Sequence, residues 1–141
     1  MKGTVLLKKI EIRKFTPTTP AGDYVDRKKS LTKEILEKIP NIEELRQKTI
    51  GKKLSLEICF YLNDQTGEEG DTQKDLDNLL NVVFDVIPQH FTDEKNEPVD
   101  GLGLIEDKSD YMIFETYAAK EFVGTHDEEG LDIEIFEFIP I

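Results

Sequence analysis

The sequence predicts a mixed α/β (α+β) fold in which helices pack on a β-sheet of about four strands. Stretches rich in β-branched and aromatic residues alternate along the chain with stretches whose apolar residues repeat at helical spacing. Their order is one strand, two helices, a strand, a helix and two strands, which is typical of a mixed sheet with helices packed on it. The 141 residues are enough for one ordinary core, so we expect a single domain over residues 1–141.

The first strand and the first helix lie near the start of the chain. Ile10 and Ile12 alternate with polar residues within TVLLKKIEIRK, as in a strand, and the proline-containing stretch that follows is a loop. Ser30 is a candidate cap for a helix over residues 31–39, because apolar residues fall on one face of it and Pro40 ends it.

The later elements follow from local signals. Asn41, with a glutamate three residues on, matches a capping box and predicts a second helix or turn over residues 42–49. KLSLEICFYLN is the clearest strand, and the polar loop DQTGEEGDTQ follows it. A helix then begins within residues 74–85 and ends near Pro88. Residues 88–105 are expected to be irregular. YMIFETYAA and LDIEIFEFI are two final strands, expected to be antiparallel neighbours joined through VGTHDEEG.

The composition excludes several classes of protein. With 38% hydrophobic and 34% charged residues the chain is globular, and no apolar run approaches the ~20 residues that span a bilayer. The N-terminal residues lack a signal-peptide pattern, and the single cysteine, Cys59, cannot form an intrachain disulfide. A cytoplasmic protein without a membrane partner is therefore expected.

The charge is divided unevenly along the chain. The net charge is −12, but residues 1–53 hold 14 lysines and arginines against 7 acids, a net of +7, and residues 54–141 carry −19. Such asymmetry suggests one basic face that a polyanion could approach and one acidic face. Taken alone, the basic segments are better explained as solvated loops and strand ends.

The helix that starts within KDLDNLLNVVFD has an apolar stripe and a polar edge. At 100° per residue, Leu76, Leu80, Val83 and Ile87 fall on one face, with Leu79 and Phe84 flanking it. Three polar residues spaced four apart, Asp77, Asn81 and Asp85, run along one edge of this stripe.

Two clusters of acidic residues within residues 54–141 can be interpreted in two ways. Asp75 and Asp77 stand at the helix start, where acids commonly cap the helix and oppose its dipole. Glu106, Asp107 and Asp110 follow a glycine-containing turn, where polar residues are also ordinary. Taken together, the two groups supply oxygen ligands of the kind that Mg²⁺ prefers, and a Mg²⁺ ion in such a site can activate water and stabilise charge on a phosphodiester.

KDLDNLLNVVFD followed by GLIEDKS resembles the RusA-type Holliday junction resolvases, which are small, dimeric, Mg²⁺-dependent endonucleases. The family pattern is D-x-D-N-x-x-K-x-x-x-D and then, after a spacer, an acidic pair that leads into a strand. Asp75, Asp77, Asn78 and Asp85 stand at the matching positions, and Glu106–Asp107 occupies the place of the acidic pair. The resemblance covers about 35 residues.

The resemblance implies a RusA-like fold, a homodimer and cleavage of four-way DNA junctions in recombination and repair, with Asp75, Asp77 and Asp107 as catalytic acids that bind Mg²⁺. Asn81 stands where the family has a lysine that would stabilise charge on the phosphate, and it offers only a neutral donor. The loop GEEGDTQK before the motif is acidic where the family is often basic, and the spacer is longer. Basic residues that are candidates to hold DNA phosphates are Lys14, Arg27, Lys28, Lys29, Lys74 and Lys108.

A second hypothesis is a catalytically degenerate member of the same family, which binds a divalent cation or a partner without cleaving DNA. Asn81 and the −19 segment favour it. In a third, the acids are only helix caps. His90 and His126 are isolated in loop-like surroundings without a ligand-spaced partner, and Cys59 is most simply a small core residue.

Overall fold

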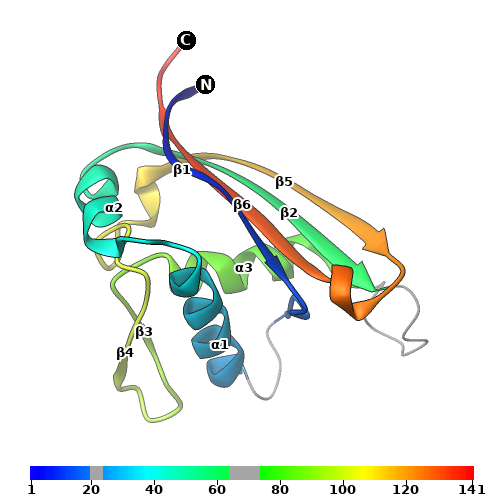
Figure 1. Ribbon diagram of the computed structural model, residues 1–141. Helices are drawn as coiled ribbons and strands as arrows, with labels where there is room; N and C mark the ends of the chain where they lie inside the picture. The colour runs from blue at the N-terminus through cyan, green and yellow to red at the C-terminus, as the bar shows by residue number, and fades with distance from the viewer. Residues whose placement is uncertain (20–23, 64–73) are drawn as a thin grey trace.

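The computed structural model describes residues 1–19, 24–63 and 74–141 (Figure 1). Its architecture is mixed α+β, with a four-stranded mixed sheet, as predicted. The elements in chain order are β1 (Lys2–Arg13), α1 (Tyr24–Glu37), α2 (Ile42–Thr49), β2 (Leu54–Asn63), α3 (Leu76–Val86), β3 (His90–Thr92), β4 (Pro98–Asp100), β5 (Ile113–Val123) and β6 (Gly130–Phe138), with short 3₁₀ turns at Asp110–Met112 and His126–Glu128.

The four long strands form one sheet in the order β1-β6-β2-β5. β6 runs antiparallel to both β1 and β2, and β5 runs parallel to β2. The expectation that the last two strands are neighbours is therefore wrong, because β2 lies between them. Their connection crosses the end of β2, where Glu129 accepts a hydrogen bond from the backbone N–H of Asn63 at 3.2 Å.

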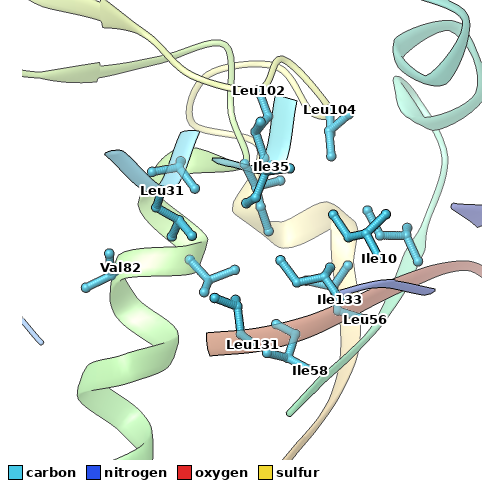
Figure 2. Packing of buried hydrophobic residues seen from close by; sticks show 14 of the residues in the cluster. Ile10, Leu31, Ile35, Leu56, Ile58, Val82, Leu102, Leu104, Leu131 and Ile133 are labelled. Carbon is cyan, nitrogen blue, oxygen red and sulfur yellow. The ribbon is translucent and has the colours of Figure 1, made fainter. Parts of the chain in front are cut away.

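The core lies between the sheet and the helices. Every second residue of β2 is buried, and Figure 1 shows α1 and α3 on the same face of the sheet. Side chains from β2, β6, α1 and α3 meet there, together with Leu102 and Leu104 from the segment before β5 (Figure 2). The five inward residues of β2 are at most 2% exposed: Leu54, Leu56, Ile58, Phe60 and Leu62.

The approach of β1 to β6 is close enough to require a glycine. Gly130 pairs with Arg13 in the register of the two strands and has a φ of +156°. A Cβ at this position would lie 1.8 Å from the carbonyl oxygen of Ile12. A side chain there would therefore separate the two strands.

The helices confirm the local signals in part. α2 begins where Asn41 predicted it, and the Asn41 side chain accepts a hydrogen bond from the Glu44 N–H at 3.1 Å. α1 begins at Tyr24, so Ser30 lies inside the helix and does not cap it. Because Tyr24 and Val25 pack against the core, tertiary contacts extend this helix upstream of its apolar repeat.

The buried face of α3 is turned from the expected one. Leu79, Val82, Val83 and Val86 are buried, whereas Leu76 and Leu80 are only partly buried. At 100° per residue, the centre of this buried face is about 80° from the centre of the predicted stripe. This rotation places Asp77 and Asn81 on the exposed face of the helix.

Residues 88–105, expected to be irregular, contain a short hairpin and close over the end of α3. β3 and β4 pair antiparallel. The N–H groups of Leu102, Gly103 and Leu104 donate to the carbonyls of Val86, Pro88 and Ile87 at 2.8, 3.0 and 2.9 Å, respectively. The segment between β4 and β5 is thus fixed to the C-terminal end of α3. Within the described residues, no helix is long and apolar enough to cross a membrane.

Candidate functional site

Asp75 and Asp77 lie at the start of α3 with both carboxylates exposed. Asp75 occupies the N-cap position, but its side chain makes no capping hydrogen bond. Among the described residues, neither carboxylate has a hydrogen-bond or ion-pair partner. The two acids therefore do not serve as side-chain caps in this structure, although both lie where the positive end of the helix dipole favours an anion.

Two lysines fasten the chain immediately before these acids. The Lys74 ammonium donates to the Pro17 carbonyl at 2.8 Å, and the Lys120 ammonium of β5 donates to the Lys74 carbonyl at 2.9 Å. The start of α3 is thus held between the segment after β1 and the second half of β5. The two ammonium groups also bring positive charge to this end of the sheet.

Asp107 lies at the opposite end of α3 and, unlike Asp75 and Asp77, its carboxylate has a partner. One carboxylate oxygen accepts from the His90 backbone N–H and the other contacts the His90 Nδ1, both at 2.8 Å. The hydrogen bond with the imidazole is the main reason that the pKa of the Asp107 carboxyl is lowered from its usual value. His90 Nε2 lies 3.7 Å from an Asp100 carboxylate oxygen.

The three acids that the resemblance implied as one metal site are therefore not brought together within this chain. Asp75 precedes the first turn of α3 and His90 follows its last, and the 11 residues of the helix alone span about 16 Å. Asp107 is held at the far end because residues 102–104 are hydrogen-bonded there. Among residues 1–19, 24–63 and 74–141, no group of three or more histidine, cysteine or acidic side chains could hold a metal ion.

Asn81 and Asp85, two further residues of the helical motif, also have distinct surroundings. Asn81 is exposed on α3. Asp85, one turn later, accepts a hydrogen bond from the Tyr24 hydroxyl and lies 3.9 Å from the Lys28 ammonium of α1. Burial and this hydrogen bond raise the pKa of the Tyr24 hydroxyl. Asp85 therefore joins α3 to α1.

Lys28, which was expected among the DNA-binding residues, is buried in the structure. It is only 6% exposed, and its ammonium lies over the rings of Tyr24 and Phe91, 4.1 and 4.9 Å from their centroids. An ammonium buried between two rings is stabilised by cation–π attraction and is not presented to a phosphate backbone. A run of basic residues in a sequence does not show which member of it faces inward.

The remaining basic candidates do not share one end of the molecule. Lys14 follows β1 at a positive φ of 56°, three residues before the proline that Lys74 contacts. Lys108, also at a positive φ, is next to Asp107 at the other end of α3. Lys29 is exposed and Arg27 half-buried, both on α1. The acidic loop GEEGDTQK lies outside the described residues up to Gln73.

Sequence reasoning missed the roles of both histidines. The partner of His90 is 17 residues away and is brought to it by the hairpin, so no spacing rule could have found it. His126 Nδ1 lies 2.8 Å from Glu129, which is 1% exposed and also accepts from the Thr16 hydroxyl at 2.9 Å. That pair is three residues apart, a spacing that could have indicated it.

A cavity of about 650 Å³ adjoins the histidine and not the start of α3. The residues that line this cavity include His90, Asp100, Arg46 and Glu43. Arg46 is held by the Leu102 carbonyl at 2.8 Å and pairs with Glu43. Arg46 is thus engaged by Leu102 and Glu43, and His90 by Asp107.

Comparisons with protein-family models, with curated proteins and with solved structures found no match.

Proposed function

We propose that this chain is a Mg²⁺-dependent endonuclease of branched DNA, with Asp75 and Asp77 as its metal-binding acids. The observation that supports the proposal is the pair of exposed carboxylates at the start of α3, neither of which has a partner among the described residues. A Mg²⁺ ion in a phosphoryl-transfer site is commonly held by one or two carboxylates, with water and substrate phosphate completing its shell. Two acids are therefore sufficient for such a site.

In this proposal the two aspartates hold the ion, which supplies polarisation of a phosphate oxygen and a more acidic bound water when present. The Lys74 and Lys120 ammonium groups raise the local positive potential for the DNA backbone. Asn81, exposed one turn after Asp77, is placed to donate a neutral hydrogen bond to a phosphate. The four-way junction as substrate, the homodimer and a cytoplasmic location belong to the same proposal and rest on the sequence pattern.

A second candidate is a RusA-like binding protein that does not cleave DNA. Two observations favour it: Asn81 replaces the lysine of the family pattern, and Asp107 is held by His90 at the other end of α3. Such a protein would bind a divalent cation or a partner through the acids at the start of α3. It would lack the charge that stabilises the leaving group.

Cleavage of a synthetic four-way junction in the presence of Mg²⁺ separates the two candidates. We expect the wild type to nick the junction and Asp77→Asn to abolish nicking, because the metal loses half of its protein ligands. Asp127→Asn, at an exposed acid in the 3₁₀ turn before β6, is the matched control and should nick as the wild type does. Unchanged nicking by Asp77→Asn would refute the site.

Two further variants complete the assay. Nicking by Asn81→Lys but not by the wild type would establish the second candidate. We expect Asp107→Asn to retain nicking within a few-fold, since its carboxylate contacts His90. A loss as complete as that of Asp77→Asn would place Asp107 in the metal site and contradict the two-acid arrangement.

A further inference from the structure

One side of β5 has no strand partner among the described residues. The strand lies at the margin of the sheet (Figure 1), and β2 is its one strand partner among the described residues. Alternate residues of β5 therefore direct their N–H and C=O groups outward, and the residues between them bond to β2. Such an edge is a template for another strand.

The two edges of the sheet differ in how they are protected. β1, at the other edge, has three register shifts against β6 and carries exposed lysines, both of which discourage strand addition. β5 pairs with β2 without interruption from Glu115 to Val123, contains no proline and has three charged residues, one lysine and two glutamates. Among the described residues, the β5 edge is thus less protected than the β1 edge.

Exposed aromatic side chains gather along this same strand. Phe114, Tyr117 and Phe122 are 47%, 49% and 53% exposed, and Tyr111 just before the strand is 74% exposed. They are four of the nine large apolar side chains that are exposed within the described part of the chain. An apolar concentration on a less protected edge is typical of an interface.

We propose that β5 pairs antiparallel with β5 of a second copy of this chain, with Ala119 on the two-fold axis. In a regular antiparallel pair, directly opposed residues both point their backbone groups toward the partner or both away. A symmetric pair is therefore centred on a residue, and charge decides which one. A centre at Ala118 opposes Glu115 to Glu121, and a centre at Lys120 opposes that lysine to itself; both are repulsive.

The centre at Ala119 avoids these contacts and keeps nine regular residues, 115–123, in the pair. It opposes Tyr117 to Glu121, Thr116 to Phe122 and the small Ala119 to itself, and it places no two like charges directly opposite. A centre at Tyr117 retains only residues 115–119 before the irregularity at the start of β5. The register at Ala119 is thus the longest that the charges permit.

The oligomeric state and a cysteine scan test this interface. We expect the wild type to sediment with twice the mass of one chain, and Ala119→Lys to raise the dimer Kd by at least about tenfold, because two ammonium groups would meet on the axis. Ala119 is exposed, so circular dichroism and Tm of this variant should match the wild type. Ala119→Ser is the control and should remain dimeric.

Oxidative cross-linking then tests the register in a Cys59→Ser background. Ala119→Cys should form a disulfide-linked dimer, because its two directly opposed Cβ atoms, about 4.5–5.5 Å apart, need only a small approach to reach the roughly 3.5–4.5 Å of a disulfide. Ala118→Cys and Lys120→Cys should not, since each faces the other and not itself. A monomeric wild type, an unaffected Ala119→Lys dimer or preferential linking at 118 or 120 would overturn the proposal. None of these measurements depends on nuclease activity.

Discussion

The pairing of Asp107 with His90 is the clearest electrostatic feature of an individual residue in this chain. Both oxygens of the carboxylate are engaged, one by a backbone N–H and one by the imidazole. Because these bonds favour the charged form, the folded-state pKa is lowered. The stabilisation from this residue is present above its unfolded pKa and is lost as the pH falls through the folded value.

His90→Ala should therefore raise the pKa of Asp107 toward its ordinary value of 3.8 without fully reaching it, because the backbone N–H remains. The carboxyl carbon of Asp107, followed by NMR through an acid titration, measures this directly. His126→Ala is the matched control and should leave the Asp107 titration unchanged, since His126 contacts Glu129. An Asp107 pKa that does not move in His90→Ala would contradict the assignment.

At the residue level, the sequence locates the start of α3 at Asp75 but does not show where Asp107 lies relative to it. The start of α3 next to Asp75 follows from local sequence signals, whereas the exposure of Asp77 also depends on how α3 is rotated against the core. The position of Asp107 depends on the bonds that fix residues 102–104 to the end of α3, and on a hairpin that brings His90 to it. Those contacts are non-local, so no short pattern encodes them.

At the scale of elements, the contact between α1 and α3 includes one buried ammonium. The Lys28 ammonium lies over the rings of Tyr24 and Phe91. It is also near the carboxylate of Asp85, which is itself partly solvated. Lys28 therefore contributes to stability largely by filling the space between the helices.

Lys28→Met should preserve most of the stability, with a loss within about 1 kcal/mol, because a thioether fills the same space and packs well on aromatic rings. Lys28→Ala should cost more, about 2 kcal/mol or above, because it leaves a cavity. Urea unfolding measures both, and Lys29→Ala at the exposed neighbour is the control. Equal losses for Met and Ala would show that the charge, and not the packing, is what matters.

The elements also show where sequence patterns are informative. The strand over residues 54–63 and the capped α2 were predictable because alternation and capping are local. The extension of α1 back to Tyr24 and the rotation of α3 depend on what each helix packs against. The last two strands were wrongly expected to be neighbours, because the short connection VGTHDEEG does not fix which strand β6 joins.

At the scale of the whole molecule, β6 is the strand on which the sheet depends. It lies between β1 and β2 and contributes Leu131, Ile133 and Ile135 to the core, each at most 5% exposed. Without it, β1 has no strand partner among the described residues.

A chain that ends at Glu129 should therefore fail to fold, with loss of dispersion in its amide NMR spectrum and of a cooperative thermal transition. A chain that ends at Phe138 is the control and should fold, because residues 139–141 are exposed. A cooperative transition in the shorter chain would show that β2, β5 and the helices form a stable unit without β6.

The proposed pairing of two copies along β5 has a consequence for the proposed nuclease. A two-fold axis between antiparallel edge strands is perpendicular to the sheet, so the helices of both copies would lie on one side of it. Lys120, one residue from the axis, contacts the Lys74 carbonyl next to Asp75. Two pairs of acids would thus face one DNA molecule from neighbouring positions, an arrangement suited to paired nicks.

The central place of β6 also bears on how the protein is made. A ribosome adds roughly 5–20 residues each second, so β1 emerges several seconds before the strand that it must join. During that time the apolar faces of β1 and β2 have no complete sheet to enter. Sheet formation is consequently a late event in synthesis, and the nascent chain should be a client for chaperones that hold exposed apolar segments.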